Sequence, residues 1–176
     1  MLSAADDVSK YTTIFKQGSI LKQKAACKKL RWEGLSNVKI YDQIEQRLLE
    51  NYTDPSKEKS DYVAWLSKGL SYSGQEKYRP TLEKVASEAG NKRARKHAKN
   101  SLLVLEKYRR WNPIISDRSQ FNNSVSANFN RLANMIRSND LELQETAASR
   151  INYQKLFDND YLLSVLDTAV KRAYQK

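Results

Sequence analysis

His97 and Cys27, the single histidine and the single cysteine of the chain, are its first candidates for chemistry. A histidine that acts as a general base needs a nucleophile to activate and an acid to orient it, and the neighbouring sequence supplies neither. We therefore expect His97 on the surface or flank of a helix. Lysines surround Cys27 and could lower the pKa of its thiol, which would make it reactive. The alternative, which we favour, is a small side chain buried in the core.

Sites for a metal or a cofactor are not predicted either. One cysteine and one histidine are too few for a Cys/His zinc site, and the five glycines lack the spacing of a phosphate-binding loop. The segment 158–160, Asp-Asn-Asp, begins like a calcium loop, but no glycine stands at the sixth position and Ala169 stands where a bidentate glutamate is needed. We expect Asn159 or Asp158 to cap the next helix instead. The sequence predicts a protein that is not an enzyme and has no cofactor.

Basic side chains are gathered in two runs of the chain, which has a formal net charge of +11. Residues 92–110 hold eight basic side chains and one acid, Glu106, and residues 22–31 hold basic side chains with no acid. On helices at 100° per residue, each run forms a strip, with Arg93 and His97 on the other flank of the second. Such strips attract anions, but they can also be solvated helix faces. The candidate partner-binding residues are Lys24, Lys28, Arg31, Lys92, Arg95, Lys96, Lys99 and Arg110.

Three tryptophans stand near these strips, and two interpretations are open for them. Trp32 and Trp111 follow or end a basic run, and Trp65 lies inside a helical pattern between them. Aromatic rings interleaved with lysine and arginine can stack nucleic-acid bases while the cations hold phosphates. The other interpretation, which we favour, is packing between helices.

Helical periodicity runs through the whole chain. Apolar residues recur at spacings of three and four, and only five glycines and three prolines interrupt them, which predicts an all-α protein. The expected helices span approximately 8–16, 19–32, 39–52, 58–70, 78–89, 92–110, 121–136, 140–151 and 162–173.

The ends and faces of the helix at 92–110 follow from particular residues. Pro113 should stop it, because proline has no N–H to donate and disfavours helical backbone in the residue before it. Gly90 should end the preceding helix in the left-handed conformation. Leu103 and Val104 widen the apolar arc, so we expect neighbours to cover this helix on more than one side.

Short turns join the expected helices in pairs, which predicts helical hairpins. The second helices start near residues 20, 58, 93 and 142, and the first two intervals fall within the periods of helical repeats. We therefore expect a right-handed α-solenoid of about four hairpins plus a terminal helix, in a single domain over residues 1–176. An irregular helical bundle without a true repeat is the alternative.

The segment YRPTLEKVASEAGNKRARKHAKNSLLVL, residues 78–105, resembles the HEAT repeat family. Pro80 lies in its first helix, a turn of small residues follows, and the second helix has Ala94-Arg95, Ala98 and Leu102 in the pattern of that family. The resemblance implies a curved scaffold that binds proteins, or more rarely nucleic acid, along its concave side. It implies no catalytic residues.

Together these observations predict a binding scaffold with a basic concave face and a protein partner that has an acidic surface. The alternatives are a protein that binds the phosphate backbone of DNA or RNA and, third, an enzyme acting on nucleic acid. No segment approaches the length of apolar residues that a membrane span needs, and we expect a cytoplasmic protein. The last helix has an apolar surface too broad for a capping helix with one wet face, which predicts a homodimer through that helix. This surface comprises Leu162, Leu163, Val165, Leu166 and Val170.

Overall fold

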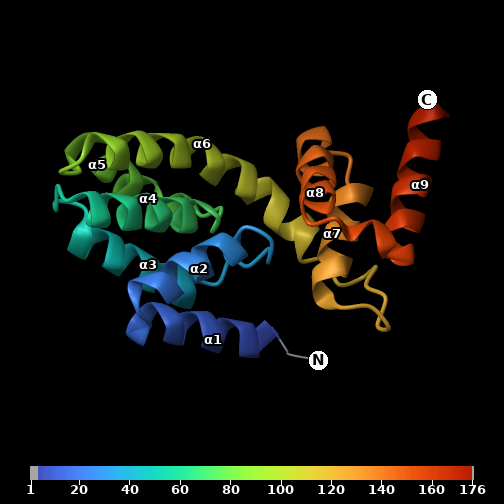
Figure 1. Ribbon diagram of the computed structural model, residues 1–176, viewed down its shortest axis with the longest axis horizontal. Helices are drawn as coiled ribbons and strands as arrows, with labels where there is room; N and C mark the ends of the chain where they lie inside the picture. Colours follow the sequence, from blue (N-terminus) through green and yellow to red (C-terminus); the bar gives the residue numbers. More distant parts are fainter. Residues whose placement is uncertain (1–3, 176) are drawn as a thin grey trace. The chain divides into compact units, whose positions relative to one another are not determined.

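The computed structural model is built of helices over the residues that it describes, 4–175, and these residues form no strand (Figure 1). The all-α class is thereby confirmed. Residues 1–3 and 176 of the expected domain lie outside this range. The α-helices are α1 (Ala4–Gln17), α2 (Ile20–Leu30), α3 (Val38–Asn51), α4 (Lys57–Ser71), α5 (Arg79–Glu88), α6 (Lys92–Ile115), α7 (Ala127–Arg137), α8 (Leu141–Tyr153) and α9 (Asp160–Tyr174). Short 3-10 turns, η1 (Glu76–Tyr78) and η2 (Leu156–Asp158), precede α5 and α9.

Polar side chains start most of these helices, as helix capping requires. Ser19, Ser56 and Ser126 each accept a hydrogen bond from the backbone N–H three residues later. The side chain of Asn159 accepts from Leu162 N at 3.0 Å and so caps α9. The prediction of a helix cap is confirmed at Asn159.

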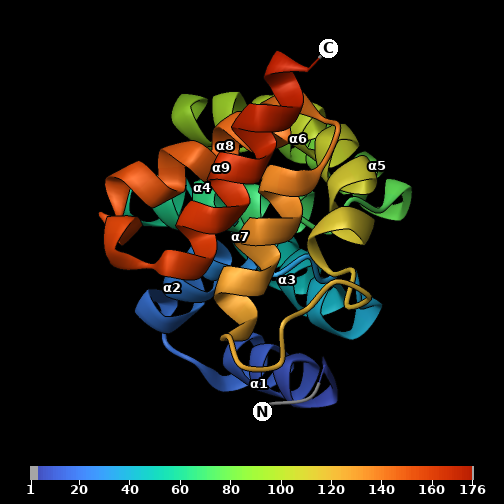
Figure 2. The same cartoon turned by 90° about the vertical axis from the view of Figure 1, so that its right-hand side faces the viewer.

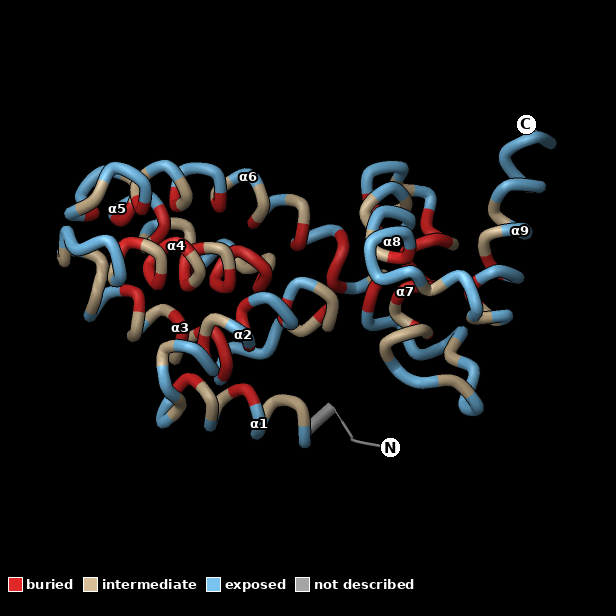
Figure 3. The backbone as a smooth tube through the Cα atoms, viewed as in Figure 1, coloured by how far each residue is buried: buried red, intermediate tan, exposed pale blue. Residues whose placement is uncertain are grey.

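The chain packs as two compact units. Within the described residues, unit 1 comprises residues 4–31 and Leu35–Asn112, and unit 2 comprises Trp32–Gly34 and residues 113–175. In unit 1, α1 packs on α2 and α3, α3 packs on α4, and α4 packs on α2. The buried sides of these helices face one another (Figure 3).

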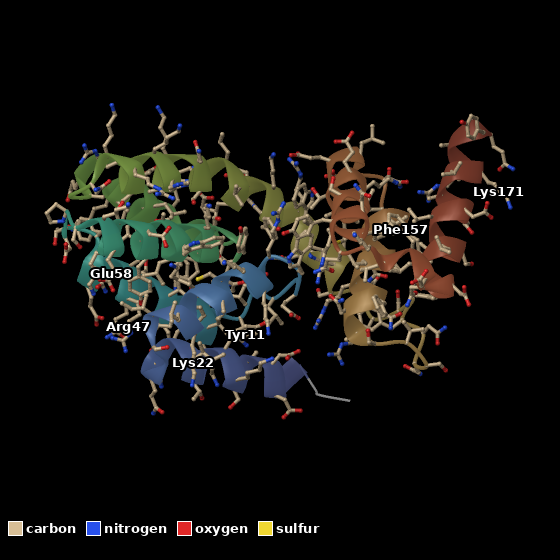
Figure 4. All side chains as sticks on the ribbon, viewed as in Figure 1. Tyr11, Lys22, Arg47, Glu58, Phe157 and Lys171 are labelled. Carbon is tan, nitrogen blue, oxygen red and sulfur yellow. The ribbon has the colours of Figure 1, made fainter. Side chains whose placement is uncertain are left out.

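The core of unit 1 is formed by apolar side chains that recur along one side of its helices, with polar side chains at its edges. The largest fully buried side chains include Tyr11, Phe15, Ile44, Leu66 and Tyr78. Arg47 of α3 donates to the carbonyl oxygens of Phe15 at 3.0 Å and Lys16 at 2.7 Å (Figure 4). These hydrogen bonds satisfy carbonyl groups at the C-terminal end of α1 that have no partner within the helix.

Unit 2 is a group of three helices in which α8 and α9 both pack on α7 (Figure 2). Asn134 of α7 donates through its amide to the carbonyl oxygens of Ile114, Ile115 and Asp117. Residues 32–34 belong to this unit because Glu33 forms an ion pair with Arg131 and the guanidinium of Arg150 lies 4.3 Å from the ring centre of Trp32.

Two predictions about helix ends were wrong. The helix at 92–110 does not stop before Pro113 but continues through it to Ile115. Its last residues include two buried side chains, Trp111 and Ile115, and their packing outweighs the one backbone hydrogen bond that proline removes. The helix expected from 121 starts at Ala127, because Phe121 and Val125 lie in a loop that ends at the cap Ser126.

Two further predictions were wrong, one about the backbone conformation of Gly90 and one about the burial of Leu103. Gly90 is not among the glycines with a positive φ; the chain leaves α5 through extended backbone at Ala89. Gly90 is needed for another reason, since a Cβ there would lie 2.2 Å from the carbonyl oxygen of Thr53. Leu103 is 70% exposed, so neighbours do not cover that side of α6.

Candidate anion-binding site

Basic side chains of α2, α4 and α6 meet on one side of unit 1, around Asp61 and Trp65 of α4. The ammonium of Lys24 on α2 lies 2.5 Å from Asp61 Oδ2, and the guanidinium of Arg93 on α6 lies 3.7 Å from Asp61 Oδ1. We call the following group the basic cluster: Lys24, Lys28, Arg31, Lys68, Arg93 and His97, with Asp61 and Trp65.

Trp65 holds two of these cations. The ammonium groups of Lys28 and Lys68 lie 4.9 Å and 4.5 Å from the centre of its ring. Each distance is within the range in which the electron-rich face of an indole attracts a cation. Trp65 thereby keeps two lysines of neighbouring helices close together, although their charges repel each other.

The pKa shifts within the cluster indicate a positive electrostatic potential. Partial burial lowers the pKa of Lys68, and the charges of Arg93, Arg31 and Lys28 lower it further. Burial, followed by the charges of Lys68 and Arg93, likewise lowers the pKa of His97. The hydrogen bond from Lys24 lowers the pKa of Asp61, which stays ionised at neutral pH. The cationic contributions to the lowered pKa values of Lys68 and His97 reflect a positive potential at the cluster, which the ionised Asp61 offsets in part.

The structure brings three of the eight predicted binding residues together in this cluster: Lys24, Lys28 and Arg31. The other five predicted residues, all on α6, are not part of the cluster. The side of α6 that faces α4 carries Arg93 and His97 instead. Arg95 turns toward the start of the helix, where it donates to the carbonyl oxygen of Ala89 at 2.5 Å. Lys92, Lys96, Lys99 and Arg110 are exposed along the outside of α6.

Sequence reasoning missed the contribution of α4. Asp61, Trp65 and Lys68 are spaced by four and three residues, the same spacing as Lys24, Lys28 and Arg31 on α2. This pattern places each set on one face of its helix. The same spacing on α2 and α4 was a signal from which the cluster could have been predicted. It was missed because Asp61 and Lys68 carry opposite charges and so do not form a basic run.

The other candidates for chemistry have structural roles. Cys27 is buried, and burial raises the pKa of its thiol, so the core interpretation is confirmed. Trp111 is buried, and its ring centre lies 5.3 Å from that of Tyr108, one turn earlier in α6. Within residues 4–175, no three His, Cys, Asp or Glu side chains lie together in a way that could hold a metal ion.

Unit 2 carries a second surface feature, an apolar groove of about 460 Å³ between α8 and α9. Ile136 of α7, Leu141 and Ala148 of α8, and Leu166 and Val170 of α9 line it. Leu163 and Val170 of α9 are 41% and 52% exposed. Part of the apolar surface expected on the last helix is therefore uncovered within this unit.

No family model, no curated protein and no solved structure matches the chain. The likeness to HEAT repeats accordingly stays a prediction from the sequence. None of the helices in the described part of the chain has the length and apolar character needed to cross a membrane.

Proposed function

We propose that the chain is a helical scaffold that binds a protein with an acidic surface through the basic cluster. The observation that supports this proposal is the meeting of cations from α2, α4 and α6 around one carboxylate and one indole. The side chains come from three helices separated in sequence, so packing of the helices holds them at constant spacing. A surface of this kind attracts an anionic partner over a distance and orients it on contact.

The architecture we propose for the scaffold is the right-handed α-solenoid of HEAT-like hairpins. The described residues form nine α-helices, which is the number expected for four hairpins and a terminal helix. We propose that α2, α4 and α6 line the concave face and that the protein acts in the cytoplasm.

Binding to the phosphate backbone of DNA or RNA is the second candidate. The convergence of several cations would suit phosphates as well as carboxylates. However, Lys28 and Lys68 already lie against Trp65, so this ring is not an open platform for a base. The geometry therefore favours the acidic protein.

Charge reversal tests which surface binds. We compare Lys28→Glu/Arg93→Glu, which removes cations of the cluster, with Lys92→Glu/Lys99→Glu, which makes the same change of charge on the outside of α6. Fluorescence anisotropy with a labelled oligoglutamate peptide and with single-stranded and duplex DNA measures affinity for each variant. We expect the first variant to bind oligoglutamate at least about tenfold more weakly, and the second to bind nearly as the unchanged protein does.

The same titrations distinguish the two candidate partners when they are repeated between about 50 and 200 mM salt. Preference for DNA over oligoglutamate, with affinity that falls log-linearly with salt, would establish the second candidate in place of the first. Equal losses in the two variants would show that net charge alone attracts the peptide and would contradict the assignment to the cluster.

A further inference from the structure

Asp61 is the one carboxylate of the basic cluster, and both of its oxygens face cations. Oδ2 accepts from Lys24 of α2, and Oδ1 lies near the guanidinium of Arg93 of α6. A carboxylate of the chain itself therefore lies between two cations of separate helices. This is the arrangement that a partner's aspartate or glutamate would need at such a surface.

The position of Asp61 is open to exchange with another anion. The side chains of Lys24, Asp61 and Arg93 are 24%, 34% and 60% exposed, so none is closed off by packing. Lys28, Arg31 and Lys68 add positive charge nearby, and Asp61 offsets only part of it. An incoming carboxylate would meet favourable potential, and it would compete with Asp61 for Lys24 and Arg93.

We infer that Asp61 occupies the anion position in the free protein, and that the partner presents carboxylate side chains that take its place. The inference rests on the proposed function, which it deepens by naming the chemistry recognised and the residue that limits affinity. Asp61 holds Lys24 and Arg93 in position before binding, and it rejects anions too weak to displace it. Removing its charge should therefore strengthen binding, which a purely structural ion pair would not do.

The test is Asp61→Asn, which keeps the size of the side chain and removes its charge. The control is Asp42→Asn, which makes the same change of charge in unit 1 at a carboxylate paired with Lys77 at 2.8 Å. Affinity for labelled oligoglutamate is measured for both variants and for the unchanged protein. We expect Asp61→Asn to bind roughly tenfold more tightly and Asp42→Asn to change affinity less than about twofold.

Each result has a definite meaning. Equal affinities of the two variants, or weaker binding by Asp61→Asn, would overturn the inference while leaving the proposed function intact. A gain in affinity for DNA without a gain for oligoglutamate would overturn the carboxylate assignment. If the unchanged protein and Asp61→Asn both fail to bind oligoglutamate even at low salt, the proposed function itself fails.

Discussion

Trp65 and Asp61 of α4 show how two side chains of one helix can bring together cations of that helix and of its neighbours. Trp65 collects Lys28 and Lys68, and Asp61 collects Lys24 and Arg93. Both residues are spaced so that they lie on the same face of α4. The cluster is therefore ordered by the middle helix, although most of its cations come from the helices on either side.

Helices α2 and α4 approach each other closely where Gly69 meets Cys27. A Cβ at position 69 would lie 2.6 Å from Cys27 Sγ and 3.3 Å from its Cβ. Because both residues are buried, a larger side chain at either position has no free space to enter. This contact allows the cations of α2 to reach Asp61 and Trp65.

We predict that Gly69→Ala lowers the free energy of unfolding by about 1 kcal/mol, because overpacking costs more than the gain in helix propensity. Cys27→Ala alone should also destabilise, by about 1 kcal/mol, since it leaves a small cavity. The double variant should lose less than the sum, because removing the sulfur makes room for the new methyl group. Urea unfolding of the four proteins measures this coupling, and strictly additive losses would contradict it.

For α6, the sequence predicts which face is buried, but it does not predict which of the two basic flanks joins the cluster. Helical periodicity places Ala94, Ala98 and Leu105 on one face of α6, and all three are buried. Its two flanks are both basic, and only the position of α4 decides that Arg93 and His97 join the cluster. Charge alone cannot distinguish flanks of the same sign.

The last helix presents the clearest expectation about association. Leu163 and Val170 are exposed on α9 beside the apolar groove of unit 2, and exposed apolar surface of this kind favours docking of another chain. We predict that the protein forms a homodimer through α9. Leu163→Lys/Val170→Lys should raise the dissociation constant of the dimer at least about tenfold, because two apolar side chains would no longer be buried.

Sedimentation equilibrium over a concentration series measures this association. The matched control is Leu21→Lys/Leu103→Lys, which replaces leucines of unit 1 that are 76% and 70% exposed. This control should associate as the unchanged protein does. A strictly monomeric protein at high concentration would count against dimerisation, and equal effects of the two double variants would show that the contact is not specific to α9.

Over the whole molecule, the chain combines a strong positive charge with a core rich in tyrosine. Five of its ten tyrosines, Tyr41, Tyr62, Tyr72, Tyr78 and Tyr108, have a raised pKa, in each case chiefly because burial disfavours the phenolate. The pKa of Tyr62 is raised to about 12. Ionising these side chains is therefore coupled to unfolding.

The direction of this coupling follows from the two pKa values of each tyrosine. The unfolded chain ionises near pH 10, whereas the folded chain keeps these phenols protonated, so their contribution is complete below pH 10 and is lost above it. We predict that the free energy of unfolding falls above pH 10 by about 1.4 kcal/mol per pH unit for each such tyrosine.

Parallel measurements of tyrosinate absorbance and circular dichroism during an alkaline titration check this prediction. A first group of tyrosines should ionise while the helices remain, and the buried group should ionise only together with loss of helix. Smooth ionisation of all ten before any loss of helical signal would contradict the prediction.

The amino-acid sequence by itself determined the local features of this protein. Apolar spacing of three and four residues marks the helices, and Asn159 is a helix cap by its residue type and position. The burial of Ala94 and Ala98 follows from the same periodicity. These features depend on interactions between residues a few positions apart, which the sequence contains directly.

Only the tertiary structure decided which side chains meet. Asp61 contacts residues 37 and 32 positions away in sequence, and Trp65 gathers lysines from two helices. The continuation of α6 through Pro113 and the close approach of Gly90 to Thr53 likewise depend on packing that overrides a local preference. The sequence of a helix determines which residues share a face, but the packing of neighbouring helices determines which of these faces contributes to a binding site.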